Sequence, residues 1–262
     1  MTRLRTADLR EALDVIYSMS SEADDDPFPL ETLEALKRLL RVDCAVYCEY
    51  PLQSSSSAYQ LGTRAKPDWL HEPLSRYGLQ DPIHAAYYSD AIQPVAISDL
   101  VTRARFHRLE LYDTVCAPLA VEDSLRVYLP APAGQTRFFF FDRDRRGFAR
   151  RERSLLELLR PHLAARRRRY RERFALRSLT ARERDVLDQV TTGRSNTEIA
   201  QKLWIAEGTV RKHLNHIYEK LGVETRTEAA RLLLGGGTPG RRGGAGPTAS
   251  GTAGASDLAP AK

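Results

Sequence analysis

Long hydrophobic runs are missing from this sequence, and so is a secretory signal. No stretch of the 262 residues approaches the roughly 18 consecutive apolar residues that a membrane-spanning helix needs. Residues 1–13 form an amphipathic pattern that includes acidic side chains, which is unlike a secretory signal. We therefore expect a cytoplasmic protein that has no membrane partner.

Cysteine is scarce, and its spacing does not match the common metal motifs. Cys44 and Cys48 share one side of an expected strand, and neither they nor Cys116 forms a C-x-x-C pair. The histidines are scattered without the spacing of metal ligands. We interpret the cysteines as small core residues in a reducing compartment, with a thiol sensor as the alternative. No metal and no cofactor are expected.

Catalytic motifs are also lacking. The sequence has no phosphate-binding glycine loop, no G-x-S-x-G and no H-E-x-x-H. Cys116 and His107 lie close together in the sequence, as such pairs do by chance in many chains. We therefore expect a protein that is not an enzyme.

Lysine is rare, and charge is divided unevenly along the chain. Only 6 of the 40 basic residues are Lys, which indicates a GC-rich genome rather than a site made of arginines. Residues 160–234 carry 17 Lys and Arg against 9 Asp and Glu, whereas residues 1–159 have a net charge of −4. An acidic N-terminal part followed by a basic C-terminal part is typical of a sensor domain joined to a module that binds a polyanion.

Residues 179–234 predict four short helices. Three of the expected helix starts have Ser or Thr followed three residues later by Glu: Thr180 and Glu183, Ser195 and Glu198, Thr225 and Glu228. Each pair forms a capping box, in which the hydroxyl and the carboxylate satisfy backbone N–H groups at the helix start. Three such boxes ahead of apolar-periodic runs predict an all-α, four-helix domain.

The third of these helices, over 207–221, has two distinct faces at 100° per residue. Its apolar residues share one narrow face: Val210, Leu214, Ile217 and Leu221. The opposite face and its flanks carry Thr209, Arg211, Lys212, Asn215, His216 and Glu219. Such a helix can enter a DNA major groove, although an ordinary amphipathic helix with a solvated face shows the same pattern. The short helix before it favours a helix-turn-helix over about 196–216.

This stretch resembles the C-terminal DNA-binding domain of the LuxR family of bacterial transcription regulators. The matching words are LTARERDVL from Leu179, G-x-S-N-x-E-I-A from Gly193, TVRKHL from Thr209 and KLGV-x-TRTEA from Lys220. The resemblance implies that two copies bind a two-fold operator on double-stranded DNA, with half-sites about one helical turn apart.

The same resemblance assigns the homodimer contact to the fourth helix, over 225–234. Its small and apolar residues Ala229, Ala230 and Leu233 would allow close approach of the two copies. RNA polymerase is a further candidate partner.

The wheel and the family positions together give three candidates for contacts with base edges: Arg211, Lys212 and Asn215. Arg or Lys can pair with guanine, and Asn can pair with adenine. The candidates for contacts with the DNA backbone, which set register and make affinity fall with salt, are Ser195, Asn196, Thr209, His216, Lys220 and Arg226.

The start of the third helix departs from the family. Ala206 stands where the family most often has Ser, and Ala at this position stabilises a helix by about 1 kcal/mol less than Ser does. Either packing of Val210, Leu214 and Ile217 makes this departure tolerable, or the first turn is weakly held and becomes firm when a DNA phosphate takes the place of the cap.

Residues 1–149 predict an α/β sensor domain of the GAF or PAS type, with helices flanking a small antiparallel sheet. The helices are expected over 4–20, with Leu9, Leu13 and Ile16 on one side, and over 27–40, 67–77, 82–88 and 106–114. The strands are expected over 42–50, 59–61, 95–97, 124–129 and 136–141. Four consecutive phenylalanines at 138–141 indicate a central strand that is covered on both faces. The acidic residues 22–26 follow a helix rather than a strand, which argues against a phosphoacceptor receiver domain.

The first domain resembles the GAF-like sensor regions of LuxR-type regulators. The words that carry this resemblance are ISDL from Ile97, LELYDTVCAPLAVEDSL from Leu109 and GFARRERSLLELLRPHL from Gly147.

A fainter likeness links it to the domain that binds acyl-homoserine lactones in quorum-sensing LuxR proteins. It rests on PDWL from Pro67, Asp81-Pro82-Ile83 and PVAISDL from Pro94. The candidate ligand-pocket residues for an unknown small molecule are Trp69, Tyr77 and Asp81. Tyr77 is too far from Trp69 for the family's spacing, and Ala96 or Ile97 holds the place of a second Trp. The alternative is that Trp69 packs in the core and Asp81 caps a helix.

Two further segments complete the chain. Residues 150–177 predict a basic helical linker, with Leu155, Leu158, Leu159 and Leu163 as an apolar stripe broken at Pro161. The arginine run 166–173 either is solvated, contacts the DNA backbone, or covers an acidic surface of the sensor. The tail, 235–262, is rich in Gly, Ala, Pro, Thr and Ser, and we expect it to be disordered.

The predicted organisation is therefore a sensor domain over 1–149, the linker, a LuxR-type domain over 178–234 and the tail. This predicts a DNA-binding transcription regulator that its N-terminal domain controls through a small ligand or a protein contact. The alternative is a ligand-binding or partner-binding protein whose C-terminal domain serves mainly for dimerisation.

Overall fold

The computed structural model describes residues 4–20, 26–51, 59–64, 67–87 and 93–234. The chain divides into two compact units, Met1–Arg177 and Ser178–Lys262. The tail expected over 235–262 and most of the acidic loop expected over 22–26 lie outside the described residues.

An antiparallel sheet organises the first unit. Within the described residues it has five strands in the order β2-β1-β5-β4-β3. Their bounds are β1 Cys44–Pro51, β2 Tyr59–Gly62, β3 Val95–Ala96, β4 Asp123–Leu129 and β5 Gln135–Arg143. The predicted pairing of the last two strands is confirmed, with Leu129 opposite Arg137 at the turn end of the hairpin. The small antiparallel sheet with flanking helices is the expected architecture.

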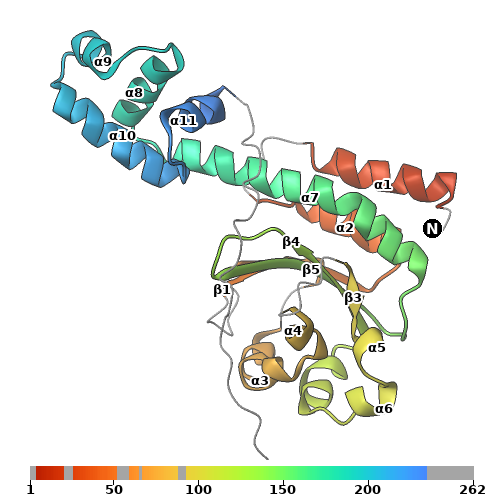
Figure 1. Cartoon of the computed structure of the whole chain (residues 1–262). Coiled ribbons are helices and arrows are strands. Elements are labelled where there is room, and N and C mark those ends of the chain that lie inside the picture. Colours follow the sequence, from red (N-terminus) through yellow and green to blue (C-terminus); the bar gives the residue numbers. More distant parts are fainter. Residues whose placement is uncertain (1–3, 21–25, 52–58, 65–66, 88–92, 235–262) are drawn as a thin grey trace, which may run out of the picture. The chain divides into compact units, whose positions relative to one another are not determined.

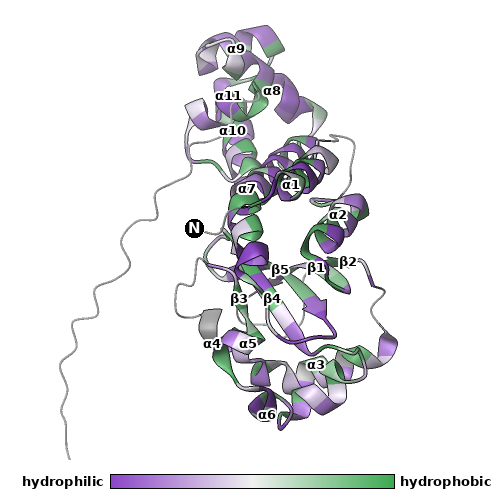
Figure 2. Ribbon diagram, turned by 90° about the vertical axis from the view of Figure 1, so that its right-hand side faces the viewer, coloured by the Kyte–Doolittle hydropathy of each residue, from purple (hydrophilic) through white to green (hydrophobic). Residues whose placement is uncertain are grey.

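Helices cover both faces of this sheet (Figure 1). One face carries α1 (Thr6–Ser18), α2 (Leu30–Leu40) and α7 (Arg150–Arg177). The other carries α3 (His71–Tyr77), α4 (Pro82–Tyr87), α5 (Ile97–Leu100) and α6 (Arg103–Phe106). Figure 2 shows hydrophobic residues on the strands and on the helices that cover them.

The four phenylalanines of the central strand β5 confirm that it is buried on both faces. Phe139 and Phe141 pack into the core beneath α1, α2 and α7. Phe138 and Phe140 turn to the second core, which α3 to α6 cover. A strand with apolar residues at every position is what two covered faces require.

The first helix corrects an expectation about its buried side. Leu9 and Leu13 share a side of α1, but they are 43% and 62% exposed, while Asp8, Ala12 and Val15 are buried. The cause is an ion pair, because Asp8 accepts a hydrogen bond from Arg151 of α7 at 2.7 Å. That contact turns the side of α1 that bears Asp8 towards the core.

Two further expectations in the first unit were wrong. The helix expected over 106–114 is interrupted, since α6 ends at Phe106 and a π-helical turn covers Tyr112–Cys116. The stripe of α7 consists of Leu155, Leu156, Leu159 and Leu163, which are buried, whereas Leu158 is 42% exposed. The helix also continues through Pro161, which lies on its exposed side.

The second unit contains the four predicted helices. They are α8 (Ala181–Thr191), α9 (Asn196–Leu203), α10 (Glu207–Leu221) and α11 (Arg226–Leu233). Capping boxes at Thr180, Ser195 and Thr225 begin α8, α9 and α11, as predicted, and Ala206 begins α10 without a side-chain cap.

Candidate nucleic-acid interface

The third helix of the second unit, α10, has the two faces that the helical wheel predicts. Its buried residues are Val210, Leu214, Ile217 and Leu221. Its polar residues Arg211, Lys212, Asn215 and His216 are exposed. One apolar stripe thus holds the helix in the domain, and the charged and amide side chains stay available for an outside partner.

A short turn connects α9 to α10 in helix-turn-helix order. Trp204 ends α9 in the left-handed conformation, with φ of 55°, and the Ile205 N–H donates to the Ala200 carbonyl at 3.0 Å. Arg182 of α8 donates to the Leu203 carbonyl at 2.5 Å. The backbone of the turn is therefore held by hydrogen bonds on both sides, although Trp204 itself is 93% exposed.

The start of α10 has no side-chain cap, but contacts of Glu207 that the sequence did not reveal hold its first turn. The Glu207 carboxylate accepts a hydrogen bond from the Thr197 hydroxyl of α9 at 3.1 Å and one from the Arg211 guanidinium at 2.6 Å. The Arg211 hydrogen bond holds the pKa of Glu207 below its ordinary value. Glu207 thus joins the first turns of the two helices, and the first turn is tied in place before any DNA is present.

The three base-edge candidates differ in how free their side chains are. Arg211 is exposed but already paired with Glu207. Among the described residues, Lys212 and Asn215 have no side-chain hydrogen bond or ion pair. Lys212 and Asn215 can therefore reach a base without losing a contact, whereas Arg211 must exchange its partner.

Three of the backbone-contact candidates meet at the start of α9. The Ser195 hydroxyl accepts from the Glu198 N–H at 3.3 Å and donates to the Glu198 carboxylate at 2.8 Å. Arg226 of α11 donates to the Asn196 side-chain oxygen at 3.2 Å and also to the Arg194 carbonyl. These contacts hold the first turns of α9 and α11 together, so the three side chains already have structural partners.

Lys220 lies apart from that group. Its ammonium is 2.6 Å from the carboxylate of Glu183, which is also the capping residue of α8. Burial acts to raise the pKa of Glu183, but hydrogen bonds from Lys220 and Thr180 outweigh it, and the pKa lies below its ordinary value. A pair 37 residues apart in sequence carries no local signal, so only the folded domain reveals this structural role.

The remaining candidates for DNA backbone contacts lie on α10, and the helix expected to form the dimer contact is α11. Thr209 and His216 are exposed on α10. On α11, Ala229 is fully buried within its own domain and cannot contact a second copy. Ala230 and Leu233 are half-buried.

The three candidate pocket residues of the first unit have different surroundings. Trp69 is 45% exposed, so it does not pack in the core. Tyr77 is partly buried against the second core. Asp81 accepts a hydrogen bond from the Ile83 N–H at 2.9 Å, which caps α4, and it also pairs with the Arg126 guanidinium.

Polar residues on the sheet beneath α3 to α6 were missed from the sequence. Arg126 of β4 lies over the Phe138 ring at 5.1 Å, and burial raises the pKa of Asp142 on β5 to about 6. The only local hint is a basic residue inside the apolar strand pattern of β4. Cys44, Cys48 and Cys116 are buried in the same region, and burial raises the pKa of Cys116. A thiol kept protonated in this way is a poor redox sensor.

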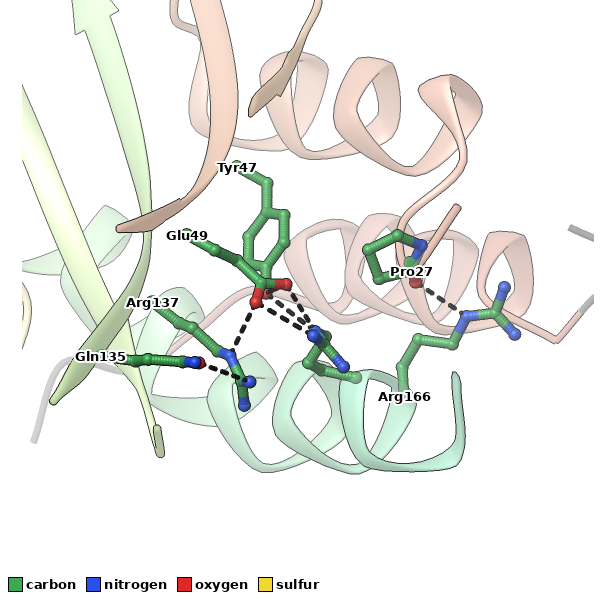
Figure 3. Close-up of polar contacts among 7 residues, drawn as sticks. Pro27, Tyr47, Glu49, Gln135, Arg137 and Arg166 are labelled. Carbon is green, nitrogen blue, oxygen red and sulfur yellow. Dashed lines mark hydrogen bonds and ion pairs between the residues drawn. The ribbon is translucent and has the colours of Figure 1, made fainter. Parts of the chain in front are cut away.

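The start of the arginine run on α7 turns towards the sheet. Arg167 donates to both carboxylate oxygens of Glu49, at 2.7 and 3.0 Å, and Arg137 of β5 donates to the same carboxylate at 3.0 Å. Figure 3 shows the carboxylate of Glu49 beside Arg137, and Arg166 directed at the Pro27 carbonyl, 3.0 Å away. Burial acts to raise the pKa of Glu49, but the bonds from Arg167 outweigh it and lower the pKa. Part of the run therefore covers an acidic group of the sensor.

No helix in the described part of the chain is long and apolar enough to cross a membrane. Among the same residues, no group of three or more His, Cys, Asp or Glu side chains could hold a metal ion.

Comparison with known proteins identifies the second unit. Residues 177–233 match the family described as bacterial regulatory proteins, luxR family. The transcriptional regulatory protein LnrK of Bacillus subtilis is 51% identical over 55 residues, which are 21% of this chain and 25% of LnrK. The CsgBAC operon transcriptional regulatory protein of Escherichia coli is 45% identical over 51 residues, which are 20% of this chain and 24% of that protein. The similarity thus spans about a quarter of the length of these relatives.

Two solved structures are similar over a longer part of the chain. The ligand-binding domain of VqsR from Pseudomonas aeruginosa has a TM-score of 0.47 and 21% identity, and covers 62% of this chain and 97% of its own. SdiA in complex with octanoyl-rac-glycerol has a TM-score of 0.46 and 16% identity, and covers 89% of this chain and 96% of its own. At these TM-scores nothing follows about a ligand of the first unit.

Proposed function

Because residues 177–233 form a LuxR-type helix-turn-helix domain, we propose that this chain is a DNA-binding regulator of transcription. The observation that carries the proposal is the division of α10 into a buried apolar face and an exposed face with Arg211, Lys212 and Asn215. The apolar stripe of α10 packs against its own domain, and the short helix α9 and a tight turn precede it. A helix in this arrangement is suited to enter the major groove.

The exposed residues of α10 take different roles in this proposal. Asn215 pairs with adenine, and Lys212 and Arg211 pair with guanine. Thr209 and His216 contact the DNA backbone. Ser195, Asn196, Lys220 and Arg226 mainly hold the domain in shape, since the structure already gives their side chains internal partners.

Two copies of the chain bind one operator in this proposal, with their α10 helices one helical turn apart on the duplex. Ala230 and Leu233 of α11 face the second copy, beside Leu234, which is 71% exposed. A two-fold arrangement matches a two-fold operator and doubles the number of contacts.

The first unit controls DNA binding through a small ligand or a protein contact, and RNA polymerase is a candidate partner of the bound dimer. We propose the boundaries 1–149 for this sensor, of the GAF or PAS type, 150–177 for the basic linker helix and 178–234 for the DNA-binding domain. Trp69, Tyr77 and Asp81 remain the candidate ligand contacts, with Arg126 added by its pairing to Asp81.

Variants of α10 test the proposal. The probe is a fluorescein-labelled duplex that the wild-type chain selects from a random pool, compared with a duplex of the same composition and scrambled sequence. Lys212→Ala and Asn215→Ala should each weaken binding to the selected duplex by about 1–3 kcal/mol and reduce the preference over the scrambled one. Glu219→Gln, at the far end of the exposed side of α10, should leave that preference unchanged. An unaltered preference in both alanine variants would contradict the proposal.

The second candidate function is a ligand-binding or partner-binding protein whose C-terminal domain serves mainly for dimerisation. The exposed Leu234 at the end of α11 is the observation that favours it. Sedimentation and the same titrations separate the two functions. Leu233→Glu should dissociate the dimer in both cases, but loss of Arg211, Lys212 and Asn215 should abolish a sequence preference only if the chain reads DNA.

A further inference from the structure

Eight of the eleven arginines of α7 fall into two groups along the helix. Those from 151 to 167 donate to acceptors in their own unit over 2.7 to 3.0 Å: Arg151 to Asp8, Arg153 to Asp99, Arg160 to the Tyr128 carbonyl, Arg166 to the Pro27 carbonyl and Arg167 to Glu49. Each of these five side chains has a structural role that explains why a donor is needed at its position.

The next arginines of the helix differ in their surroundings. Arg168, Arg169 and Arg171, which we name the outer arginine patch, are all exposed. Within the described part of the chain, Arg168 forms one ion pair, with Glu172 one turn further along the same helix, at 3.9 Å. Among the residues that the structure describes, Arg169 and Arg171 have no ion pair and no side-chain hydrogen bond.

The outer arginine patch adds little to the stability of the helix itself, since an exposed pair such as Arg168–Glu172 contributes about 0.3–0.5 kcal/mol. Arg168 and Arg171 are three residues apart, and like charges at that spacing repel each other on a helix surface. The helix dipole favours cations only in the last turn, and α7 continues to Arg177, more than one turn beyond Arg171. Three exposed positive charges are therefore available to an external anion.

We infer that the outer arginine patch is a second contact with the DNA backbone, separate from the helix-turn-helix. The guanidinium fork matches the geometry of a phosphate group, and a contact with phosphates needs no groove and no particular base. The patch would add affinity without adding sequence preference.

Chain connectivity favours duplex DNA over other polyanions. Only Ser178 and Leu179 separate the end of α7 from Thr180, the cap of the first helix of the DNA-binding unit. Once α10 holds a duplex, the DNA is present at high effective concentration around the last turns of α7. This inference rests on the proposed function, since the chain must bind DNA for the patch to reach it.

The experiment measures how binding depends on salt. The full chain and the variant R168Q/R169Q/R171Q are titrated by fluorescence anisotropy against the scrambled duplex of about 40 base pairs, roughly four helical turns. The titrations are repeated from about 50 to 200 mM salt, where log K falls linearly with log salt by about 0.9 for each phosphate contact. The triple variant should lower that slope by up to about 2.7 for each bound copy of the chain, which is about 0.9 for each arginine removed. Its preference for the selected over the scrambled duplex should stay as in the wild type.

Two controls separate charge from structure. R168K/R169K/R171K keeps the three charges and should keep the wild-type slope. R38Q/R105Q/R108Q removes three exposed arginines elsewhere in the first unit and should also leave the slope unchanged.

The outcomes are distinguishable. A wild-type chain that binds neither duplex contradicts the proposed function as a whole. A wild-type chain that binds, together with an unchanged slope in R168Q/R169Q/R171Q, overturns only the second contact. A slope that falls equally in the lysine variant, or in R38Q/R105Q/R108Q, also overturns it. If the patch instead covers an acidic surface of its own unit, the glutamine variant should unfold at a lower temperature while its slope is retained.

Discussion

The two units of this chain use charged side chains in opposite ways. In the first unit, arginines reach across the fold to largely buried carboxylates, as Arg167 and Arg137 do to Glu49 and Arg126 does to Asp81. In the second unit, three carboxylates serve the start of the helix on which they lie, those of Glu183, Glu198 and Glu228 in their capping boxes. Ion pairs between residues far apart in the sequence hold the linker helix α7 on the sheet. The capping boxes of the second unit use residues of other helices, so they do not occupy the polar side chains on the exposed side of α10.

This difference has an energetic consequence. A largely buried ion pair leaves an unpaired charge behind when one partner is removed, and such a loss is large. A capping contact at the surface contributes about 1 kcal/mol, because water can replace it. Perturbing the charges of the first unit should therefore have larger effects on stability than perturbing the caps of the second.

The largest effect is expected at Glu49. Replacement by Gln leaves Arg167 and Arg137 without their shared carboxylate, and the free energy of unfolding of the first unit should fall by about 3 kcal/mol at neutral pH. Urea unfolding, with hydrogen exchange read at β1 and β5, measures the change. The matched control is Glu157→Gln, an exposed glutamate of α7, which should change stability by less than about 0.5 kcal/mol.

The same variant predicts a pH dependence. The pKa of Glu49 lies below its ordinary value of about 4.3, so its contribution is present above that pH and is lost as the pH falls through the folded pKa. The stability difference between wild type and Glu49→Gln should thus be full at pH 7 and shrink on acidification below about pH 4. A difference that stays constant down to the acid transition would mean that charge is not the cause.

A smaller effect is expected at Lys220. Replacement by Ala removes the ammonium from the buried carboxylate of Glu183, and the second unit should lose about 1–3 kcal/mol of stability. Thermal unfolding of the full chain, with hydrogen exchange of α8 amides, measures it. Lys202→Ala, an exposed lysine of α9, serves as the control. If Lys220→Ala instead leaves stability intact but weakens binding to all duplexes equally, Lys220 is a backbone contact.

The smallest effect is expected at Ala206. Replacement by Ser supplies the cap that α10 lacks, and it should raise the stability of the second unit by about 1 kcal/mol. The gain will be reduced if the contacts of Glu207 already satisfy the first turn. Ser195→Ala at the start of α9 is the matched reverse change and should lower stability by about the same amount. Equal and unchanged melting temperatures for both variants would show that caps do not limit this domain.

Local patterns predicted the second unit nearly completely. The capping boxes at Thr180, Ser195 and Thr225 place three helix starts, and the apolar spacing from Val210 to Leu221 places the buried face of α10. Helices and caps depend on residues three or four apart, which a sequence displays directly.

The first unit was predicted less well because its determinants are far apart in the chain. The strands were found from alternation and from the four phenylalanines. The buried side of α1, however, depends on Arg151, and the inward direction of Arg167 depends on Glu49. A helical wheel ranks residues by their own polarity, so it predicted that the side of α1 with Leu9 and Leu13 is buried. In the structure, the buried side instead carries Asp8, which pairs with Arg151.

By itself, the sequence determined the family that the second unit resembles and the two faces of α10. Spacing within single helices decides which residues share a face, and the LuxR-type words lie within residues 177–233, the segment that matches the family. Only the tertiary structure decided which polar side chains are still free. Lys220, Arg226 and Asn196 have internal partners, whereas Lys212 and Asn215 have none among the described residues. The physical reason is that an ion pair forms wherever two charges meet in space, and the folded chain brings together residues that are 30 or more positions apart.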